Sequence, residues 1–284
     1  MIIDHGLQLV LLHVPKCAGT ALRRAFLEDD GNRAIENHFD FEFDPVLKRQ
    51  VDRAHRPLMD LRHRPEWRWL QRYRVVAAIR HPYQRLASAC REFLKQKSRA
   101  TEIQVRSAPP SHEQLLAYLR RLPIAMDTHD LRWVHGFPIH WFTHHGERPK
   151  VHHLLRCSHL SDDLTALGEE LNWPSSLQQR LAMVGAGAGR RGANDLDALQ
   201  QSADLRAVAN LLHVEDFACF GFRREEATIQ DPELAQLIDQ CLAVGNSHDL
   251  PLTNLTPEMR WYYGRSSPKP TLQLKPTRRW RPRP

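Results

Sequence analysis

A lysine, a glycine and a threonine follow an apolar segment in the stretch LQLVLLHVPKCAGTAL, residues 7–22. Where a strand turns into a helix, backbone N–H groups and the positive end of the helix dipole favour an anion. Ala18 and Gly19 allow the backbone to approach a ligand closely, and Lys16 adds a mobile positive charge. Thr20 can cap the helix and offer a hydroxyl. The stretch predicts a phosphate site, and a solvent-facing lysine in an ordinary turn is the alternative when it is taken alone.

A second stretch, RVVAAIRHPYQRLASACREF at residues 74–93, repeats the order of strand, loop and helix. Arg80 stands at the end of the strand, and Ser88 follows eight residues later. An arginine grips a phosphate through two charge-assisted hydrogen bonds, and a serine adds a neutral donor. A structural arginine paired with a carboxylate is the alternative, but it does not account for the first loop. Two anion sites on two βα units predict a ligand with two separated phosphates.

The elements that must position these residues follow from hydrophobic periodicity. Strands are predicted at Gln8–Val14, Arg74–Ile79 and Val151–Leu155, and the βα order predicts a P-loop-like parallel sheet flanked by helices, in the α/β class. Helices are predicted at residues 20–29, 83–97, 112–121, 161–171 with Ser161 as N-cap, 202–213 and 232–244. The stretch GAGAGRRG at 185–192 follows no strand, so it is predicted to be a glycine-rich loop and not a dinucleotide fingerprint.

Composition narrows the class of protein. With 284 residues, 42% of them hydrophobic, the chain can bury a full core. The net charge of +7 belongs to residues 265–284, which hold seven Arg or Lys and five Pro, so we expect a disordered tail and no nucleic-acid partner. The five cysteines are scattered without a C-x-x-C pair and indicate neither a disulfide framework nor a zinc ribbon. The apolar run Leu9–Leu12 is too short to span a bilayer and no signal peptide is visible, so we expect a cytoplasmic protein.

The two anion segments resemble a known family. HVPKCAGTAL is similar to the 5′-phosphosulfate-binding loop, and AAIRHPYQRLASA to the 3′-phosphate-binding segment, of sulfotransferases in the group of carbohydrate sulfotransferases and their soluble bacterial relatives. Lys16 and Arg80 lie 64 residues apart, in the order that this group shows. Weaker similarity in VHHLLRCSHLSDDLTAL and LLHVEDFACFGF extends the resemblance over roughly residues 7–222.

The resemblance implies a sulfotransferase domain at 1–222 that uses 3′-phosphoadenosine 5′-phosphosulfate (PAPS) as sulfuryl donor, without a metal. Lys16 would contact the bridging oxygen and the 5′-phosphate, and Arg80 and Ser88 would hold the 3′-phosphate. The loop residues that would cradle the 5′-phosphate, with the Thr20 hydroxyl, are Cys17, Ala18, Gly19, Thr20 and Ala21. Departures from the family pattern are His81, where an aspartate is commoner, and His213, where a tyrosine is common. Residues 223–264 are predicted to form a helical extension.

The acceptor hydroxyl needs a base, and the chain has 17 histidines. In relatives that use a histidine the base lies between the two anion segments, and AHRPL resembles that segment, so His55 is the predicted base and His63 the second choice. His140 and His144 have helical metal spacing but lack the glutamate of a zinc motif. Further candidates are Asp127, His129 and Arg132 on the acceptor side and Arg190 with Arg191 as a clamp, each with an ordinary loop as the alternative.

These expectations combine in a metal-independent sulfotransferase that acts on a hydroxyl of a glycan or other carbohydrate. The alternatives are a small-molecule kinase of the P-loop type and a non-catalytic protein that binds a nucleotide or polyanion. The basic run at 46–74 hints at an anionic glycan, although its arginines could equally be solvated or paired. The oligomeric state stays open.

Overall fold

The structure, a computed structural model, describes residues 1–28, 33–44, 49–97, 110–127, 130–146, 148–188 and 202–236. These residues form two compact units, each of which is considered by itself. The first combines the residues up to Arg80 with those from Trp141 to 188, and the second combines His81–His140 with residues 202–236. The predicted tail at 265–284 and most of the predicted extension at 223–264 lie outside the described residues.

The first unit is built on a five-stranded sheet with the order β3-β1-β2-β6-β9. Its centre is parallel: β2 (Leu9–Leu12) pairs with β6 (Arg74–Ile79), and β6 pairs with β9 (His153–Arg156). Two antiparallel strands that were not predicted, β1 (Ile2–Asp4) and β3 (Ile35–Asn37), extend the sheet beyond β2. The predicted α/β class is confirmed, with a mixed sheet in place of a purely parallel one.

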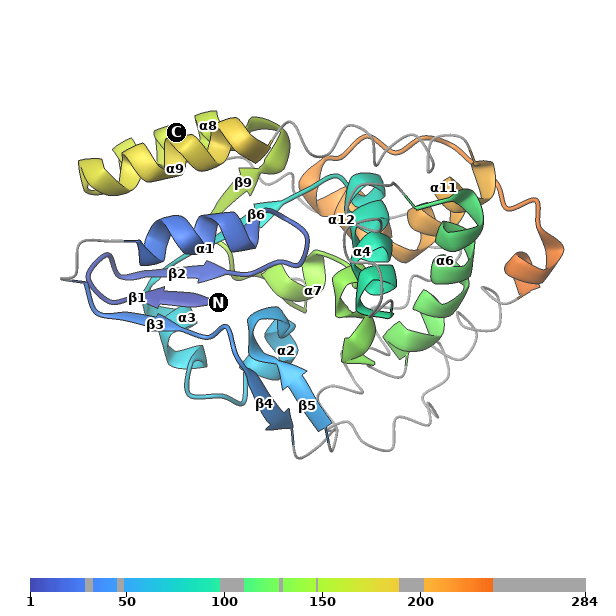
Figure 1. The fold of residues 1–284 in the computed structure, drawn as a ribbon, viewed down its shortest axis with the longest axis horizontal. Helices are drawn as coiled ribbons and strands as arrows, with labels where there is room; N and C mark the ends of the chain where they lie inside the picture. The colour runs from blue at the N-terminus through green and yellow to red at the C-terminus, as the bar shows by residue number, and fades with distance from the viewer. Residues whose placement is uncertain are drawn as a thin grey trace. The chain divides into compact units, whose positions relative to one another are not determined.

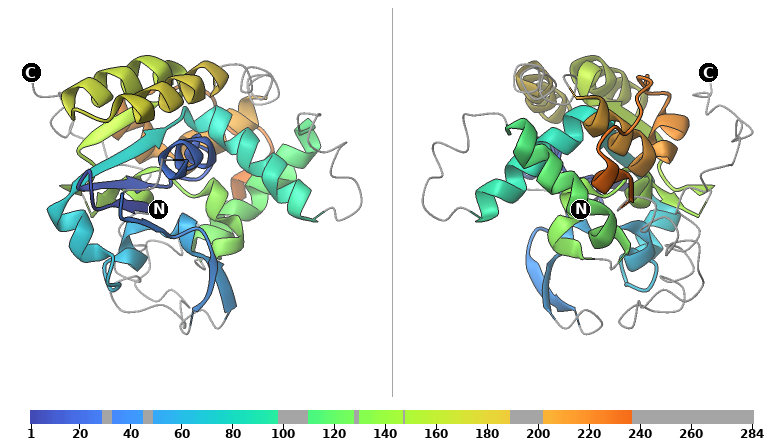
Figure 2. Two further views of the ribbon diagram at one scale, coloured as in Figure 1. Left: turned by 60° about the vertical axis from the view of Figure 1, so that its left-hand side comes forward. Right: turned by 90° about the vertical axis from the view of Figure 1, so that its right-hand side faces the viewer.

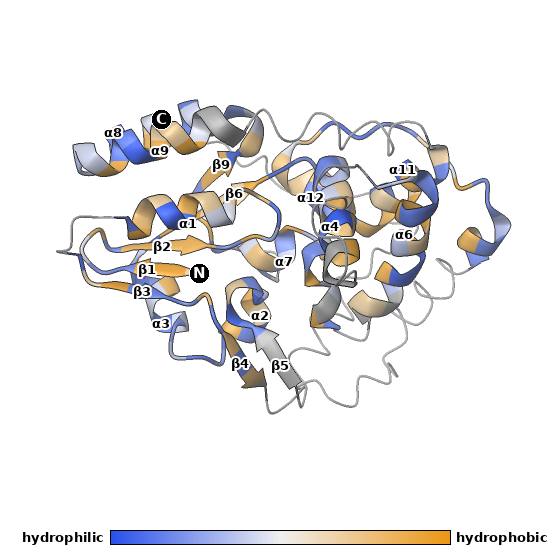
Figure 3. Ribbon diagram, in the orientation of Figure 1, coloured by the Kyte–Doolittle hydropathy of each residue, from blue (hydrophilic) through white to orange (hydrophobic). Residues whose placement is uncertain are grey.

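Buried apolar side chains explain why the central strands form. All four residues of β2 and five of the six in β6 are buried, and both strands are strongly hydrophobic in Figure 3. Strands covered on both faces carry such unbroken apolar runs. Figures 1 and 2 show α1 (Gly19–Leu27) on one face of the sheet and α3 (Trp67–Arg72) on the other.

Two further helices of this unit, α8 (Leu160–Glu170) and α9 (Ser175–Ala188), pack closely against each other, and α9 also contacts α1. A Cβ atom on Gly185 would lie 2.5 Å from the Cα of Ser161, so the glycine allows α8 and α9 to approach. The predicted loop at 185–192 is therefore wrong over residues 185–188, which close α9. The predicted cap is also wrong, because α8 begins at Leu160 with His159 as N-cap and not Ser161.

Short elements complete the first unit. A separate hairpin of β4 (Phe41–Asp44) and β5 (Arg49–Asp52) leads into the 3₁₀ turn η1 (Arg53–His55) and α2 (Leu58–Leu61). The remaining elements are β7 (His144–His145), β8 (Arg148–Pro149) and the 3₁₀ turn η3 (Cys157–His159), while α7 (His140–Thr143) begins at the boundary residue His140.

The second unit is helical where it is described. It holds α4 (Pro82–Lys97), α6 (His112–Asp127), the 3₁₀ segment η2 (Leu131–Gly136), α11 (Ala203–Leu212) and α12 (Val214–Phe220). Asp216, which is fully buried, accepts hydrogen bonds of 2.8 Å from the backbone N–H groups of Ile139 and His140. Arg85, also fully buried, donates to the carbonyls of η2. None of the helices in the described ranges is long and apolar enough to cross a membrane.

Candidate active site

The loop between β2 and α1 places the predicted phosphate-binding residues at the start of a helix. Lys16 and Ala18 both have left-handed backbone conformations, with φ of 65° and 60°. Ala18 is the N-cap of α1, and its carbonyl accepts the N–H groups of Ala21 and Leu22 at 3.0 and 3.1 Å. The first N–H groups of a helix have no intrahelical acceptor, so this end can bind an anion.

The prediction that Thr20 caps the helix is wrong. Thr20 is the second residue of α1, and no side chain caps this helix. Thr20 and Ala21 are exposed, Lys16 and Ala18 are half-buried, and Cys17 is buried. The Thr20 hydroxyl stays available as a donor at the helix start, while Cys17 contributes its backbone to the loop and its thiol to the interior.

Gly19 is required by its neighbour His13. A Cβ atom on Gly19 would lie 2.0 Å from His13 Cδ2 and 2.2 Å from His13 Nε2. The imidazole of His13 thus fills the place of a side chain at the start of α1. The ring of His13 also stacks on Phe39, with 4.6 Å between centroids, and meets His55 edge-on at 4.4 Å. Sequence reasoning treated His13 as a strand residue and missed this contact.

His55, the predicted base, lies at the end of η1 and is buried. Burial lowers the pKa of His55 to about 4, against the opposing effects of the Asp52 carboxylate and of a backbone hydrogen bond with His13. The Lys16 ammonium lowers the pKa of His55 further. The structure therefore brings the two predicted catalytic residues within electrostatic reach of each other. A neutral imidazole at physiological pH can accept a proton.

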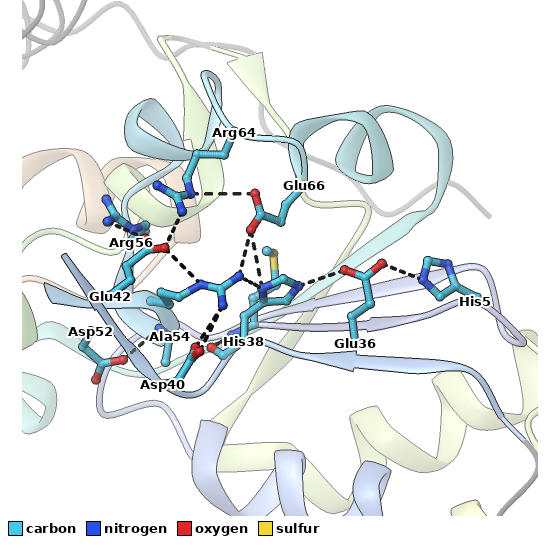
Figure 4. A network of polar contacts seen from close by, with 12 residues as sticks. His5, Glu36, His38, Asp40, Glu42, Asp52, Ala54, Arg56, Arg64 and Glu66 are labelled. Atoms are coloured by element: carbon cyan, nitrogen blue, oxygen red, sulfur yellow. Dashed lines mark hydrogen bonds and ion pairs between the residues drawn. The ribbon is translucent and has the colours of Figure 1, made fainter. Parts of the chain in front are cut away.

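A network of charged side chains fastens the segment that carries His55 (Figure 4). At its centre Arg53 forms ion pairs of 3.1, 3.4 and 3.1 Å with three carboxylates, those of Asp40, Glu42 and Glu66. Glu42 also pairs with Arg56 at 2.6 Å and with Arg64 at 2.5 Å. Three arginines of the basic run at 46–74 are therefore compensated within the protein, which removes much of its support for an anionic acceptor.

Arg80 follows β6 directly and is half-buried. A thiol hydrogen bond with Cys17 and the charge of Arg80 lower the pKa of Cys157, against the opposing effect of burial. Arg80 therefore lies beside the first turn after β9 and close to the loop that carries Cys17. Ser88 lies half-buried in α4 of the second unit, so its combination with Arg80 stays a prediction.

Most of the remaining candidates lie outside the described side chains and stay predictions. His63 is exposed after α2. Asp127 ends α6 and Arg132 lies in η2, but their side chains are outside the described part, as are His129, Arg190 and Arg191 altogether. Within the described ranges no group of three or more His, Cys, Asp or Glu residues could hold a metal ion. The expected independence from metal stays a prediction.

Residues 1–222 match the sulfotransferase family, a span that includes both anion segments and the His55 turn. Comparisons with curated proteins and with solved structures gave no match. Because the match covers most of the sequence, the chain belongs to the sulfotransferase family.

Proposed function

We propose that this sulfotransferase moves the sulfuryl group of PAPS to a hydroxyl of a carbohydrate acceptor. The observation that carries the proposal is that the ring of His13 lies against Gly19 and also meets the ring of His55, which brings this buried histidine near the lysine of the loop before α1. These two groups supply a base for the acceptor and a positive charge for the leaving phosphate. The family and the anion-binding form of the loop support PAPS as the donor.

The reaction requires one bond to form and one to break at sulfur. The acceptor oxygen forms a new S–O bond while its proton passes to the imidazole of His55. The S–O bond to the 5′-phosphate breaks, and adenosine 3′,5′-bisphosphate leaves with the electron pair. Lys16 and the N–H groups at the start of α1 stabilise the negative charge that develops on the bridging oxygen.

Binding and turnover of matched variants test this assignment. Arg80→Ala should weaken adenosine 3′,5′-bisphosphate about 10- to 150-fold, the worth of one charge-assisted contact, and barely affect adenosine 5′-phosphate. Lys16→Ala should lower turnover by about 10² to 10³ while the bisphosphate still binds. Arg72→Ala, an exposed arginine at the end of α3, is the control and should change neither value.

The two alternatives predict other results in the same assays. A kinase would bind ATP with magnesium in preference to the bisphosphate. A non-catalytic nucleotide-binding protein would bind the bisphosphate and transfer nothing to any carbohydrate in a fractionated extract supplied with labelled PAPS. Full turnover by Lys16→Ala would remove the lysine from the mechanism.

A further inference from the structure

The segment HFDFEFD at residues 38–44 alternates aromatic and polar side chains through the start of the β4–β5 hairpin. The even-numbered side chains His38, Asp40 and Glu42 all contact Arg53. Side chains two positions apart on a strand share a face, so within β4 Phe41 and Phe43 lie on the face opposite Glu42 and point away from Arg53. Together with Phe39, which precedes the strand, we call these residues the phenylalanine strip.

The inner end of the strip is fixed beside the histidines. Phe39 stacks on His13 at 4.6 Å and lies 6.4 Å from the His55 ring. The guanidinium of Arg23 lies 3.9 Å from the Phe39 centroid. Because His13 and Arg23 both contact this ring, Phe39 anchors the strip beside the base and leaves ligand contact to the next two rings.

The outer rings are exposed. Phe41 is 72% and Phe43 60% exposed, and in the described part only Met183 is a comparably exposed large apolar side chain. Phe41 pairs across the hairpin with Asp52, and such partners point to the same face. Asp52 lies 3.6 Å from His55 Nε2. The exposed rings therefore share the face of the hairpin that leads to the predicted base.

We propose that the phenylalanine strip is the acceptor subsite, on which Phe41 and Phe43 stack against the apolar faces of successive sugar rings of a glycan chain. The inference rests on the proposed sulfuryl transfer, because it needs His55 to receive one hydroxyl of that chain. The backbone positions of the two residues are about 7 Å apart along the strand, which suits a ligand that repeats along its length.

The exposure of the strip decides between classes of acceptor. A small phenol or steroid is bound in a concave pocket that covers most of its surface, and two rings left this open to water form no such pocket. A sugar ring presents one apolar face to an aromatic ring and keeps its hydroxyls in water. The arginines beneath the strip are paired with Glu42, so the site does not require an acidic glycan.

Saccharide binding tests the subsite separately from catalysis. The probes are chitohexaose and a heparosan hexasaccharide, each compared with its disaccharide, measured by calorimetry and saturation-transfer NMR on the full chain. We expect wild type to bind at least one hexasaccharide more tightly than its disaccharide. Phe41→Ala/Phe43→Ala should weaken that hexasaccharide about 5- to 150-fold, the range for two aromatic contacts, and leave adenosine 3′,5′-bisphosphate binding unchanged.

Two further variants show whether aromatic faces are responsible. Phe41→Leu/Phe43→Leu keeps the apolar bulk and should lose affinity as the alanine pair does. Met183→Ala removes an exposed apolar side chain from α9 and should have no effect. A thermal melt of each variant confirms folding, which exposed side chains should change little.

Several outcomes would overturn the subsite. The first two are hexasaccharide affinity in Phe41→Ala/Phe43→Ala equal to that of wild type, and full affinity in Phe41→Leu/Phe43→Leu. The others are failure of wild type to bind either hexasaccharide, and binding of a tyrosine peptide, instead of a saccharide, that depends on the phenylalanine strip. Failure of the proposed function looks different, because wild type would then transfer no label from PAPS to any carbohydrate, whether or not it binds the bisphosphate.

Discussion

The pH dependence of turnover is the sharpest test of His55 as the base. The imidazole must be neutral to accept a proton, and burial lowers its pKa to about 4 in the free protein. An unperturbed histidine would lose activity below about pH 6.5. We therefore expect the acid limb of kcat/KM for PAPS, which reports the free enzyme, to have its midpoint near pH 4.

The size of the effect follows from the neutral fraction. At pH 5.5 an imidazole with a pKa of about 4 is about 97% neutral, whereas one with a pKa of about 6.5 is about 9% neutral. Between pH 7.5 and 5.5, kcat/KM for PAPS should stay constant, and an unperturbed base would give about a tenfold fall. PAPS adds negative charge beside Lys16, whose ammonium lowers the pKa of His55, so the limb of kcat should lie at higher pH than that of kcat/KM.

Two variants connect the limb to His55. His55→Gln should reduce turnover by about 10² to 10⁴ and abolish the limb. Asp52→Asn should move the limb to lower pH, because the Asp52 carboxylate raises the pKa of His55, while its amide oxygen can still accept the Ala54 N–H. Glu170→Gln, which removes an exposed carboxylate near His153, is the control.

The reasoning would be refuted by a tenfold fall in kcat/KM at pH 5.5 in wild type, or by an unchanged limb in His55→Gln. Thermal melts across the same pH range separate activity from folding. Because the folded pKa is lowered, the unfolded chain binds the extra proton between about pH 6.5 and 4, and stability falls in that window as the pH is reduced.

Three further predictions concern the loop, a thiol and the second unit. Gly19→Ala should lower the free energy of unfolding by about 1 to 3 kcal/mol, because the new Cβ would clash with His13. The same substitution should cost less in a protein that carries His13→Ala. Urea titrations that give equal losses with and without His13 would contradict the clash. In a protein that carries Cys241→Ser, iodoacetamide at pH 7.5 should modify Cys157 before Cys90, because the pKa of Cys157 is lowered and burial raises that of Cys90 to about 12. Peptide mass spectrometry that shows equal rates of modification would refute this. Asp216→Ala should destabilise the protein by about 3 to 5 kcal/mol, because the buried carboxylate accepts two backbone hydrogen bonds. The pKa of this carboxylate is lowered, so wild type should lose its advantage over the variant as the pH falls below about 4. Urea unfolding at pH 3 and 7 measures both effects, and equal stability of variant and wild type at pH 7 would exclude a stabilising role for Asp216.

The elements that could be predicted are those with uniform local patterns. The apolar run at Arg74–Ile79 is β6 over its full predicted length. The predicted strand at Gln8–Val14 shortens to Leu9–Leu12, because the chain leaves the sheet before Pro15. The helix predicted at 112–121 continues to Asp127 past Pro123, which the periodic pattern alone did not anticipate. Local patterns thus located the centres of elements better than their ends.

Strands that depend on distant partners could not be predicted. β1 has three residues and includes Asp4, a charged residue that interrupts the apolar pattern. In the structure Asp4 is fully buried because Arg33 pairs with its carboxylate at 2.5 Å and the Leu7 N–H donates to it. A partner 29 positions away determines whether a buried acid is tolerated, and hydrophobic periodicity carries no such information.

The candidate site likewise contains residues that local sequence patterns could predict and residues that they could not. Lys16 and Arg80 follow apolar strands, and their positions could be predicted from the order of strand, loop and helix. His55 was found through resemblance, and nothing in its neighbours in sequence indicates that it meets His13. The contact depends on the charged network around Arg53, whose partners come from several segments. A histidine among 17 could not be distinguished by its own surroundings in the sequence.

The hairpin joins the two proposed roles through its period of two. One face of β4 carries Glu42, which pairs with Arg53, two positions before His55, and the other carries the exposed rings of Phe41 and Phe43. A slip of one residue in the strand would exchange the faces, placing charges outward and rings beneath. The ion pairs with Arg53 therefore fix the base and the orientation of the exposed rings together. Loss of Glu42 should consequently disturb both saccharide binding and turnover, whereas loss of Phe43 should disturb saccharide binding alone.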